Sequence, residues 1–417
     1  MKNMFASIAG TKRFALRAQK NNLKSFYNLS QDGLYLSSVG MGLYKGENSA
    51  KGDEEWYESL SYGLKKGINV FDTSIRYRSM RSEKILGKVI KDAINDKKIK
   101  RDEIFISTKG GLISFPDKKD KKKYVESELV KKRNINLKEI FNYTHCINLK
   151  FIEEELDQSL ENLGLEGIDT YLIHNIEFVF MLYEKKKAYD KIELLFDFFE
   201  KAVRNKKILS YGISSWAGFR RKQNSQIYVE IRNILNAAKN VGGKNHNLKF
   251  IEAPLSVGMP YIAQKKGNKK SILELIKNNK LDLLASAPLY EGHIERLINL
   301  DTLFRKAGKS ESLNNTGKAN ISLPVSENSI IQLFELLIAS RNNKSSINEK
   351  LNILNKNNSK NNYISALNLV RSTDGITSAL TGMDRLEYAK KNLKIMNEKK
   401  IKMKVANNFW NSLSINE

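Results

Sequence analysis

The chain of 417 residues has little cysteine, histidine or proline, and two of these shortages exclude a class of site. Its single cysteine, Cys146, cannot form an intrachain disulfide, which is typical of proteins from a reducing compartment such as the cytoplasm. The four histidines lack the spacing of metal ligands. Only the adjacent His145 and Cys146 could share a metal ion, and two neighbours cannot complete a tetrahedral site. We therefore expect a cytoplasmic protein without disulfides and without a metal.

Long apolar runs are also absent. No stretch approaches the ~18–20 uninterrupted apolar residues of a membrane span, so we expect no membrane partner. The start of the chain lacks the apolar segment of a secretory signal. It could form a weak basic organellar presequence built on four apolar side chains: Phe5, Ile8, Phe14 and Leu16. The interpretation that we favour is a disordered or loosely helical extension, which predicts a flexible segment over residues 1–30.

Basic residues are abundant, because 71 lysines and arginines against 46 acidic residues give a net charge of +25. Such a charge attracts polyanions and phosphate-bearing cofactors. The lysines are nevertheless spread along the chain, and no aromatic residues alternate with them as in surfaces that stack bases. We therefore expect no specific nucleic-acid partner. The lysines and arginines in the predicted loops favour an anionic substrate.

Apolar residues make up 41 % of the chain and occur in short runs that alternate with longer stretches of helical period. This alternation predicts repeated βα units. Eight strands are predicted: Leu34–Met41, Ile68–Phe71, Ile104–Thr108, Ile168–Ile173, Ile208–Ile213, Leu248–Glu252, Leu281–Ser286 and Gly375–Leu380. The predicted helices are Glu54–Lys66, Ser82–Asn95, Lys150–Leu163, Ile192–Arg204, Ile227–Lys239, Ser271–Lys277, Ser365–Arg371 and Arg385–Lys394. Such a repeat favours an α/β fold with a single (β/α)8 TIM barrel.

A doubly wound sheet is the alternative to the barrel. It normally carries a glycine-rich turn after its first strand, and Gly40-Met41-Gly42 is only a fragment of that pattern. We therefore prefer the barrel. The expected order is an extension over residues 1–30, the barrel over 31–400 with insertions at about 111–148 and 293–362, and a C-terminal tail over 401–417.

Polar side chains follow several predicted strands, where a barrel gathers them at one end. Asp72 and, five residues later, Tyr77 follow the second strand, Lys109 follows the third and His174 the fourth. A phenol is a weak acid unless an ammonium stabilises its phenolate, and a buried ammonium needs a carboxylate partner. Tyr77 could therefore protonate a carbonyl oxygen with Lys109 and Asp72 as its tuning pair. His174 would orient that oxygen.

The segments around these residues resemble the aldo-keto reductases, whose signature is similar to FDTSIRYRSMRSEKILG. Five further runs follow in the family's order: ISTKGG, SLENLGLEGIDTYLIHN, KKILSYGISSW, LLASAPLYEG and DGITSALTGMDRLEYAKKNL. The resemblance implies that Tyr77 is the general acid/base of an oxidoreductase. The enzyme would exchange a hydride between a nicotinamide dinucleotide and a small carbonyl compound or alcohol. The dinucleotide would be NADP(H), with NAD(H) as the alternative.

The same resemblance implies a set of cofactor-binding residues. Ser214, Ser215 and Glu252 would face the carboxamide of the nicotinamide. The other positions would follow the pyrophosphate and the adenosine end: Pro288, Leu289, Gly292, Gly382, Met383, Arg385 and Asn392. Glu252 stands where glutamine is common, and Leu255 where an aromatic ring usually stacks on the nicotinamide. These departures favour a second hypothesis, a dinucleotide-binding regulatory or interaction protein with little turnover.

Overall fold

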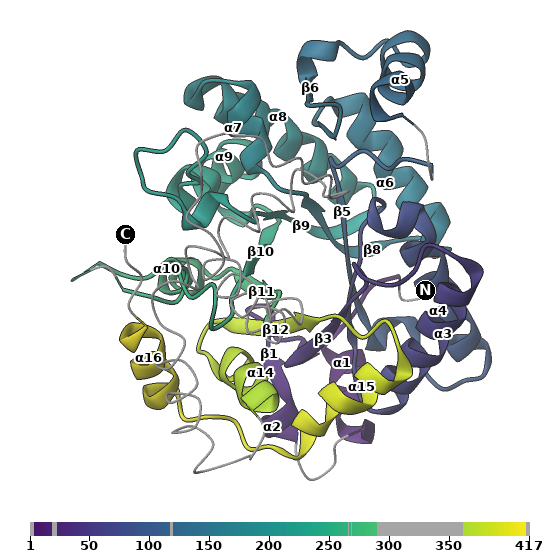
Figure 1. Ribbon diagram of the computed structural model, residues 1–417, viewed down its shortest axis with the longest axis vertical. Coiled ribbons are helices and arrows are strands. Elements are labelled where there is room, and N and C mark those ends of the chain that lie inside the picture. The colour runs from purple at the N-terminus through teal and green to yellow at the C-terminus, as the bar shows by residue number, and fades with distance from the viewer. Residues whose placement is uncertain are drawn as a thin grey trace, which may run out of the picture.

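Eight parallel strands close into a barrel in the computed structural model, which describes residues 4–18, 23–116, 120–265, 267, 269–289 and 362–413. In chain order the barrel strands are β3 (Val39–Gly42), β4 (Val70–Asp72), β5 (Phe105–Gly110), β8 (Ile168–Ile173), β9 (Ile208–Ser214), β10 (Leu248–Pro254), β11 (Asp282–Ser286) and β12 (Ile376–Thr381). Each strand pairs with the next, and β12 pairs with β3 to close the ring. The predicted TIM barrel is confirmed, and the doubly wound sheet is wrong (Figure 1).

Helices surround the barrel and connect its strands (Figure 1). The longer ones are α3 (Ala50–Lys65), α4 (Arg81–Asn95), α6 (Leu149–Leu163), α8 (Lys185–Arg204), α9 (Ile231–Gly242), α10 (Ile272–Asn278), α14 (Asn362–Ser372) and α15 (Leu386–Asn392). Shorter ones are α7 (Glu177–Leu182), η1 (Tyr77–Met80), η2 (Arg101–Glu103), η5 (Gly218–Arg220), η6 (Gly243–Asn245) and η8 (Leu393–Asn397). Local caps set several ends: Asn148 accepts from the first turn of α6, and Gly164, with φ 61°, ends it.

The interior of the barrel is filled near its amino-terminal end by apolar side chains. The strands contribute Val70, Phe105, Leu172, Phe250, Leu284 and Leu380 to this cluster. Side chains alternate between the two faces of a strand, so a residue two or four positions later also points inward. Such residues lie nearer the carboxyl end of the barrel, where the polar groups are found.

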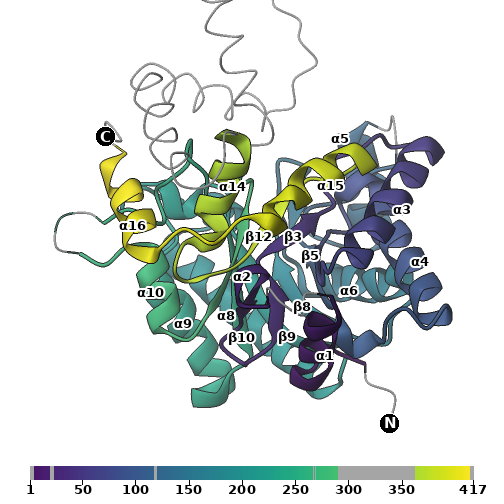
Figure 2. The ribbon, with the colours of Figure 1, turned by 90° about the horizontal axis from the view of Figure 1, so that it is seen from below.

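The N-terminal extension is folded, so the expectation of a flexible segment is wrong for its described residues, 4–18 and 23–30. It forms α1 (Ile8–Ala18), α2 (Leu23–Phe26) and the first strand of a hairpin, β1 (Tyr27–Leu29) and β2 (Tyr35–Ser37). Phe14 and Ala15 of α1 are buried in the core. Arg13 and Arg17 pair with Asp102 and Glu103 of η2. Figure 2 shows α1 at the end of the molecule opposite α15.

The predicted first strand, Leu34–Met41, is two strands in the structure. Its first half is β2 of the hairpin, and only β3 belongs to the barrel. Leu36 points into the interior cluster and thereby closes the barrel floor. Ser37 and Ser38 separate the apolar residues of the two strands, and the chain leaves the hairpin for the barrel there.

The lysine-rich insertion over 111–148 contains short elements around the stretch 117–119, which is not described. They are α5 (Lys121–Tyr124), a π-helical turn η3 (Val125–Lys132), η4 (Leu137–Glu139), β6 (Ile140–Phe141) and β7 (His145–Cys146). A bridge between Leu112 and His145 ties its two ends together. The second predicted insertion, 293–362, lies outside the described residues except for Asn362, with which α14 begins.

The predicted C-terminal tail contains a helix, α16 (Met403–Ser412). Trp410 is buried, and its Nε1 donates to Thr373 Oγ1 at 2.8 Å. Four predicted helices start three or more residues away from the prediction, since α3 begins at Ala50, α8 at Lys185, α9 at Ile231 and α14 at Asn362. Among the described helices, none is both long and apolar enough to span a bilayer.

Candidate active site

Four strands of the barrel bring their inward polar residues together above the apolar floor. Asp72 lies two residues after Val70, Lys109 four after Phe105, and Glu252 two after Phe250. His174 follows Leu172 of β8 in the same way. The alternation of the strands therefore directs all four side chains into the carboxyl end of the barrel.

The buried ammonium of Lys109 is the centre of this cluster, and its side chain has no exposed surface. Its Nζ lies 2.5 Å from Asp72 Oδ2 and donates to the Thr73 carbonyl at 3.0 Å. It also lies 3.4 Å from the Tyr77 hydroxyl. Phenol, ammonium and carboxylate thus lie in contact, as the sequence predicts for these three residues.

Glu252 adds a second carboxyl group to the cluster. Its Oε2 lies 3.2 Å from Lys109 Nζ, although without hydrogen-bond geometry. The sequence interpretation places this residue at the cofactor amide, which stays a prediction; in the structure Glu252 lies between Lys109 and the Ser214 hydroxyl. Asp72 Oδ1 and Glu252 Oε2 are both buried and lack hydrogen-bond partners among the described residues. Burial and the neighbouring Asp72 raise the pKa of Glu252 to about 8.

Burial and charge act in opposite directions on the other two groups. Burial raises the pKa of the Tyr77 phenol far above its ordinary value, while the Lys109 ammonium lowers it. Burial would lower the pKa of Lys109, but the charges of Asp72 and Glu252 outweigh it and raise that pKa. At neutral pH the site therefore holds a protonated phenol beside an ammonium ion.

His174 lies on the other side of Tyr77, with the two ring centroids 5.6 Å apart. Its Nδ1 faces Ser74 Oγ at 3.2 Å, and Nε2 has no hydrogen-bond partner among the described residues. Burial and the positive charge of Lys109 lower the pKa of His174 well below its ordinary value. The imidazole is therefore neutral at pH 7.

A second histidine supports the first. His145 Nε2 donates to the backbone carbonyl of His174 at 2.8 Å. Burial lowers the pKa of His145 to about 4, so it is neutral and can carry its proton on Nε2. The sequence did not predict this supporting role of His145. The described residues contain no cluster of three or more potential metal ligands.

The loop that carries Tyr77 has an unusual backbone, because three consecutive residues, Arg78, Ser79 and Met80, have φ of 49°, 52° and 74°. Such left-handed conformations are unfavourable for residues other than glycine and need support from surrounding contacts. Arg78 provides it: its buried guanidinium donates to Asp53 Oδ1 at 2.6 Å and to the Glu47 carbonyl at 2.8 Å. The loop is thereby tethered to the start of α3.

Tyr44, just after β3, packs its ring edge-on against Tyr77 at a centroid distance of 5.2 Å. The sequence interpretation missed Tyr44, His145 and the tether from Arg78 to Asp53. A contact between residues about 25 to 35 positions apart leaves no local signal in the sequence. The His-Cys dipeptide was visible, but its packing against β8 was not.

The two serines predicted to face the nicotinamide carboxamide have different surroundings in the structure. The Ser214 hydroxyl lies inside the barrel and makes a long hydrogen bond of 3.5 Å to Glu252 Oε1. The Ser215 hydroxyl instead accepts from the Gly218 backbone at 3.0 Å, on the loop outside the cluster. Ser214 therefore remains available to a cofactor amide, and the structure does not bring Ser215 to that place.

The predicted residues for the rest of the dinucleotide lie on two neighbouring strands. Pro288 and Leu289 follow β11 and are buried, whereas Gly292 lies outside the described residues. Gly382 and Met383 follow β12, and a side chain added at Gly382 would meet only Lys45 Cγ within 4 Å. The side-chain amide of Asn392 already forms hydrogen bonds within the protein, because it donates at 3.3 Å to Thr381 Oγ1 and to the Gly382 carbonyl.

Arg385 has the chemistry needed for a phosphate group. Its side chain is 53 % exposed, and its nearest described carboxylate, that of Glu55, is 3.7 Å from Nε. Open space at Gly382, a hydroxyl at Ser214 and this guanidinium fit an extended dinucleotide along the carboxyl ends of β9 and β12. Leu255, which is fully buried, offers no aromatic ring to the nicotinamide.

Comparison with known proteins was made on this basis. A model of the aldo/keto reductase family matches residues 38–409. The NAD(P)H-dependent D-xylose reductase of Candida tropicalis is 27 % identical over 201 residues, which cover 45 % of this chain and 50 % of that protein. The L-glyceraldehyde 3-phosphate reductase of Escherichia coli is 23 % identical over 266 residues, covering 63 % and 60 %. The chain thus matches less than two thirds of either relative's length.

Solved structures show the same barrel. A glycerol dehydrogenase from Gluconobacter oxydans superposes with a TM-score of 0.56 at 18 % identity, covering 92 % of this chain and 94 % of that one. An aldo/keto reductase from Klebsiella pneumoniae, in complex with NADP and acetate, superposes with a TM-score of 0.53 at 13 % identity, covering 94 % and 98 %. At these identities the likeness concerns the fold.

Proposed function

Because the chain belongs to the aldo/keto reductase family, we propose that it reduces an aldehyde or ketone to an alcohol, or catalyses the reverse reaction. Tyr77 acts as the general acid/base, and NADP(H) is the hydride carrier. The observation that carries this proposal is the contact of the Tyr77 hydroxyl with a buried ammonium that is itself paired with Asp72. The named activities of the two curated relatives, both reductases, support it.

The proton comes from this chain. Tyr77 is protonated at neutral pH, because burial raises its pKa, and it can donate to a carbonyl oxygen as negative charge develops there. Lys109, 3.4 Å away, stabilises the phenolate that remains. Asp72 keeps Lys109 charged despite its burial. The reverse reaction uses the same groups, with the phenolate as base.

His174 orients the substrate. The single proton of the Ser74 hydroxyl has two acceptors at 3.2 Å, the Lys109 carbonyl and His174 Nδ1. In the state in which it goes to Nδ1 of the neutral ring, the ring proton is on Nε2, which has no described partner and can donate to the substrate oxygen. The substrate oxygen would then lie between Tyr77 and His174, whose rings are perpendicular neighbours. His145 holds His174 in place through its carbonyl.

The cofactor would be held by Ser214 near the nicotinamide and by Arg385 near the adenosine phosphate, with Pro288, Leu289, Gly382 and Met383 along its length. When bound, NADPH supplies the hydride that the carbonyl carbon receives. A phosphate recognised by Arg385 favours NADP(H) over NAD(H). Residence in the cytoplasm remains a prediction from the single cysteine.

The test of this proposal compares Tyr77→Phe with Tyr57→Phe, in which a hydroxyl is removed far from the site, on α3. NADPH-dependent reduction is measured on a panel that includes D-xylose, glyceraldehyde and glyceraldehyde 3-phosphate. We expect Tyr77→Phe to lose about 100-fold or more of the activity, the usual contribution of a general acid. NADPH binding, measured by fluorescence titration, should change by only a few-fold. Full turnover by Tyr77→Phe would disprove the assignment.

The second candidate function is binding of a dinucleotide with little turnover. It is favoured by Leu255, which replaces a stacking ring, and by Glu252, one oxygen of which lies 3.2 Å from Lys109 Nζ. It predicts tight NADPH binding by the wild type without reduction of any carbonyl on the panel. Clear turnover by the wild type would eliminate it.

A further inference from the structure

Arg76, directly before Tyr77, has a guanidinium group that the acid-base mechanism does not use. Its side chain is half-buried, and its Cζ lies 4.9 Å from the centroid of the Phe115 ring. The ammonium of Lys121 lies 5.9 Å from the same ring. Two cations from different segments thus flank Phe115, at the start of the insertion after β5.

The guanidinium of Arg76 is not paired with a carboxylate of the described residues. Its guanidinium makes no hydrogen bond or ion pair with any residue that the structure describes. Burial lowers its pKa, and the one carboxyl group that acts against this is that of Glu155. Burial raises the pKa of Glu155 well above its ordinary value, so that its negative charge is suppressed. Oε2 of Glu155 also accepts a hydrogen bond from the Gly111 backbone N–H at 2.6 Å.

Arg78 provides an internal comparison, because it lies on the same loop two residues further on. Its Nε and Nη2 donate to Asp53 and to two backbone carbonyls, whereas its buried Nη1 has no hydrogen-bond partner among the described residues. Arg76 lacks such partners among the described residues, and none of its nitrogens is a fully buried atom, so its donors stay accessible. A half-buried guanidinium that packs on Phe115 with its donors accessible can bind an anionic group that arrives with the substrate.

The guanidinium of Arg76 also acts on the reacting groups. Its positive charge contributes to lowering the pKa of His174. The ring of Tyr44 packs against Tyr77, and the charge of Tyr44 acts to raise the pKa of Arg76 against the effect of burial. Arg76 also directly precedes Tyr77, and its backbone N–H donates at 3.2 Å to Ser74 Oγ, which faces His174 Nδ1, so it lies beside both residues that would contact the carbonyl oxygen.

We propose that Arg76 binds an anionic group of the substrate, a carboxylate or a phosphate, and that the enzyme selects carbonyl compounds that carry such a group. This inference rests on the proposed reductase function and narrows its substrate class. Lys121 adds a second positive charge beside Phe115. A planar guanidinium can bind either anion through two parallel hydrogen bonds, so both sources need to be tested.

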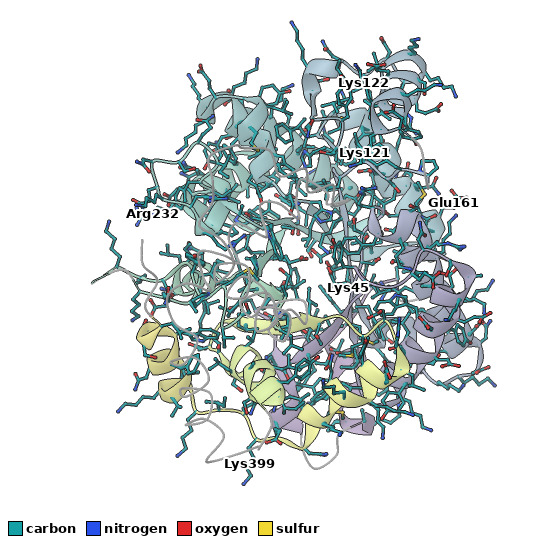
Figure 3. The ribbon with its side chains drawn as sticks, viewed as in Figure 1. Lys45, Lys121, Lys122, Glu161, Arg232 and Lys399 are labelled. Atoms are coloured by element: carbon teal, nitrogen blue, oxygen red, sulfur yellow. The ribbon has the colours of Figure 1, made fainter. Side chains whose placement is uncertain are left out.

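The experiment measures kcat/KM for matched substrates that differ in charge: succinic semialdehyde against butanal, and glyceraldehyde 3-phosphate against glyceraldehyde. The variants are Arg76→Met and Arg76→Lys. Arg232→Met is the control, because Arg232 is exposed on α9 at an outer edge of the molecule (Figure 3). For the wild type we expect a preference of about 10- to 100-fold for at least one charged partner, which is typical of hydrogen bonds to charged groups.

Arg76→Met should bring this ratio close to one, and Arg76→Lys should retain part of it. Since any change in His174 or Tyr77 affects both members of a pair, the ratio isolates recognition of the anion. A preference within the succinic semialdehyde pair indicates that the site takes a carboxylate, and a preference within the glyceraldehyde 3-phosphate pair indicates a phosphate. A wild-type ratio near one, or an unchanged ratio in Arg76→Met, would overturn the inference.

A binding measurement separates this inference from the proposed function. Quenching of intrinsic fluorescence by succinate, with succinamide as the neutral reference, is compared in the wild type and Arg76→Met, and inorganic phosphate is titrated in parallel. Anion binding that depends on Arg76, together with no turnover of any carbonyl, would refute the reductase and keep the anion site. Turnover of neutral carbonyls, without anion binding and without a preference for charged substrates, would keep the reductase and refute the anion site.

Discussion

At the scale of single residues, the feature that distinguishes this site is the pair of carboxyl groups around Lys109. Asp72 Oδ2 lies 2.5 Å from Lys109 Nζ. Glu252 Oε2 lies 3.2 Å from the same nitrogen and has no hydrogen-bond partner among the described residues. An ionised Glu252 raises the pKa of Tyr77, because a nearby negative charge disfavours the phenolate. Glu252 therefore acts on the acid through charge and need not touch the substrate.

The first prediction concerns Glu252→Gln. In the wild type, Glu252 ionises with a pKa raised to about 8, and its charge then keeps Tyr77 protonated as the pH rises. Glutamine has no such charge, so Tyr77 loses its proton at lower pH. The alkaline decline of carbonyl reduction should shift to lower pH, and alcohol oxidation, which needs the phenolate, should begin at lower pH.

The measurement is the pH profile of kcat/KM in both directions. Glu161→Gln is the control, because Glu161 is exposed on α6 at an edge of the molecule (Figure 3). Superimposable profiles for the wild type and Glu252→Gln would contradict this role. A uniform loss of activity at every pH would indicate a structural effect alone.

At the scale of elements, the loop after β4 combines a strained backbone with a buried tether. The three left-handed residues after Tyr77 set the direction in which the phenol points. Arg78 holds them to Asp53 and to the backbone before α3. The position of the catalytic group thus depends on a contact between two loops at the carboxyl end of the barrel.

Arg78→Met should release this loop. We expect the free energy of unfolding to fall by about 2 kcal/mol, the typical contribution of a hydrogen bond to a charged group. Reduction should slow by up to about 100-fold, because the phenol would no longer be held in place. Urea unfolding and kcat for reduction measure the two effects.

Arg81→Met is the matched control, since Arg81 pairs with the same Asp53 but is more exposed. It should have the smaller effect on both quantities. Equal effects of the two variants would show that the ion pair, and not the buried tether, supports the loop.

Much of the site could be predicted because its signals are local. Asp72, Lys109 and His174 each end or follow an apolar strand, and the rule that barrel strands present their carboxyl ends together is enough to associate them. The contact of Glu252 with Lys109 could not be predicted, because it depends on how β10 and β5 face each other across the closed barrel. The same holds for His145, which reaches His174 from the insertion.

At the scale of the whole molecule, the N-terminal segment closes one end of the barrel and the chemistry occupies the other. Leu36 and Ala6 complete the apolar floor, and α1 covers η2 at the amino-terminal end. The sequence did not reveal this, because a basic amphipathic stretch fits a presequence, a loose tail and a packed helix equally well. Its acidic partners, Asp102 and Glu103, lie far away in the chain.

Phe14→Ala should therefore destabilise the whole barrel. Phe14 is 3 % exposed, and removing a buried aromatic ring costs about 3–5 kcal/mol of the free energy of unfolding. Ile8→Ala in the same helix should change it by less than about 0.5 kcal/mol, because Ile8 is 54 % exposed. Urea unfolding compares the two, and a similar small effect of both would mean that α1 does not contribute to the stability of the barrel.

The lone thiol has a practical consequence for spectroscopy. Cys146 is fully buried, and burial raises its pKa to about 12, so maleimides should leave it unmodified in the folded protein. A cysteine engineered at the surface, for instance at Lys121, would then be the one position to carry a dye or spin label. The signal of such a probe would test whether the environment of the insertion changes when ligands bind, without a background cysteine to remove first.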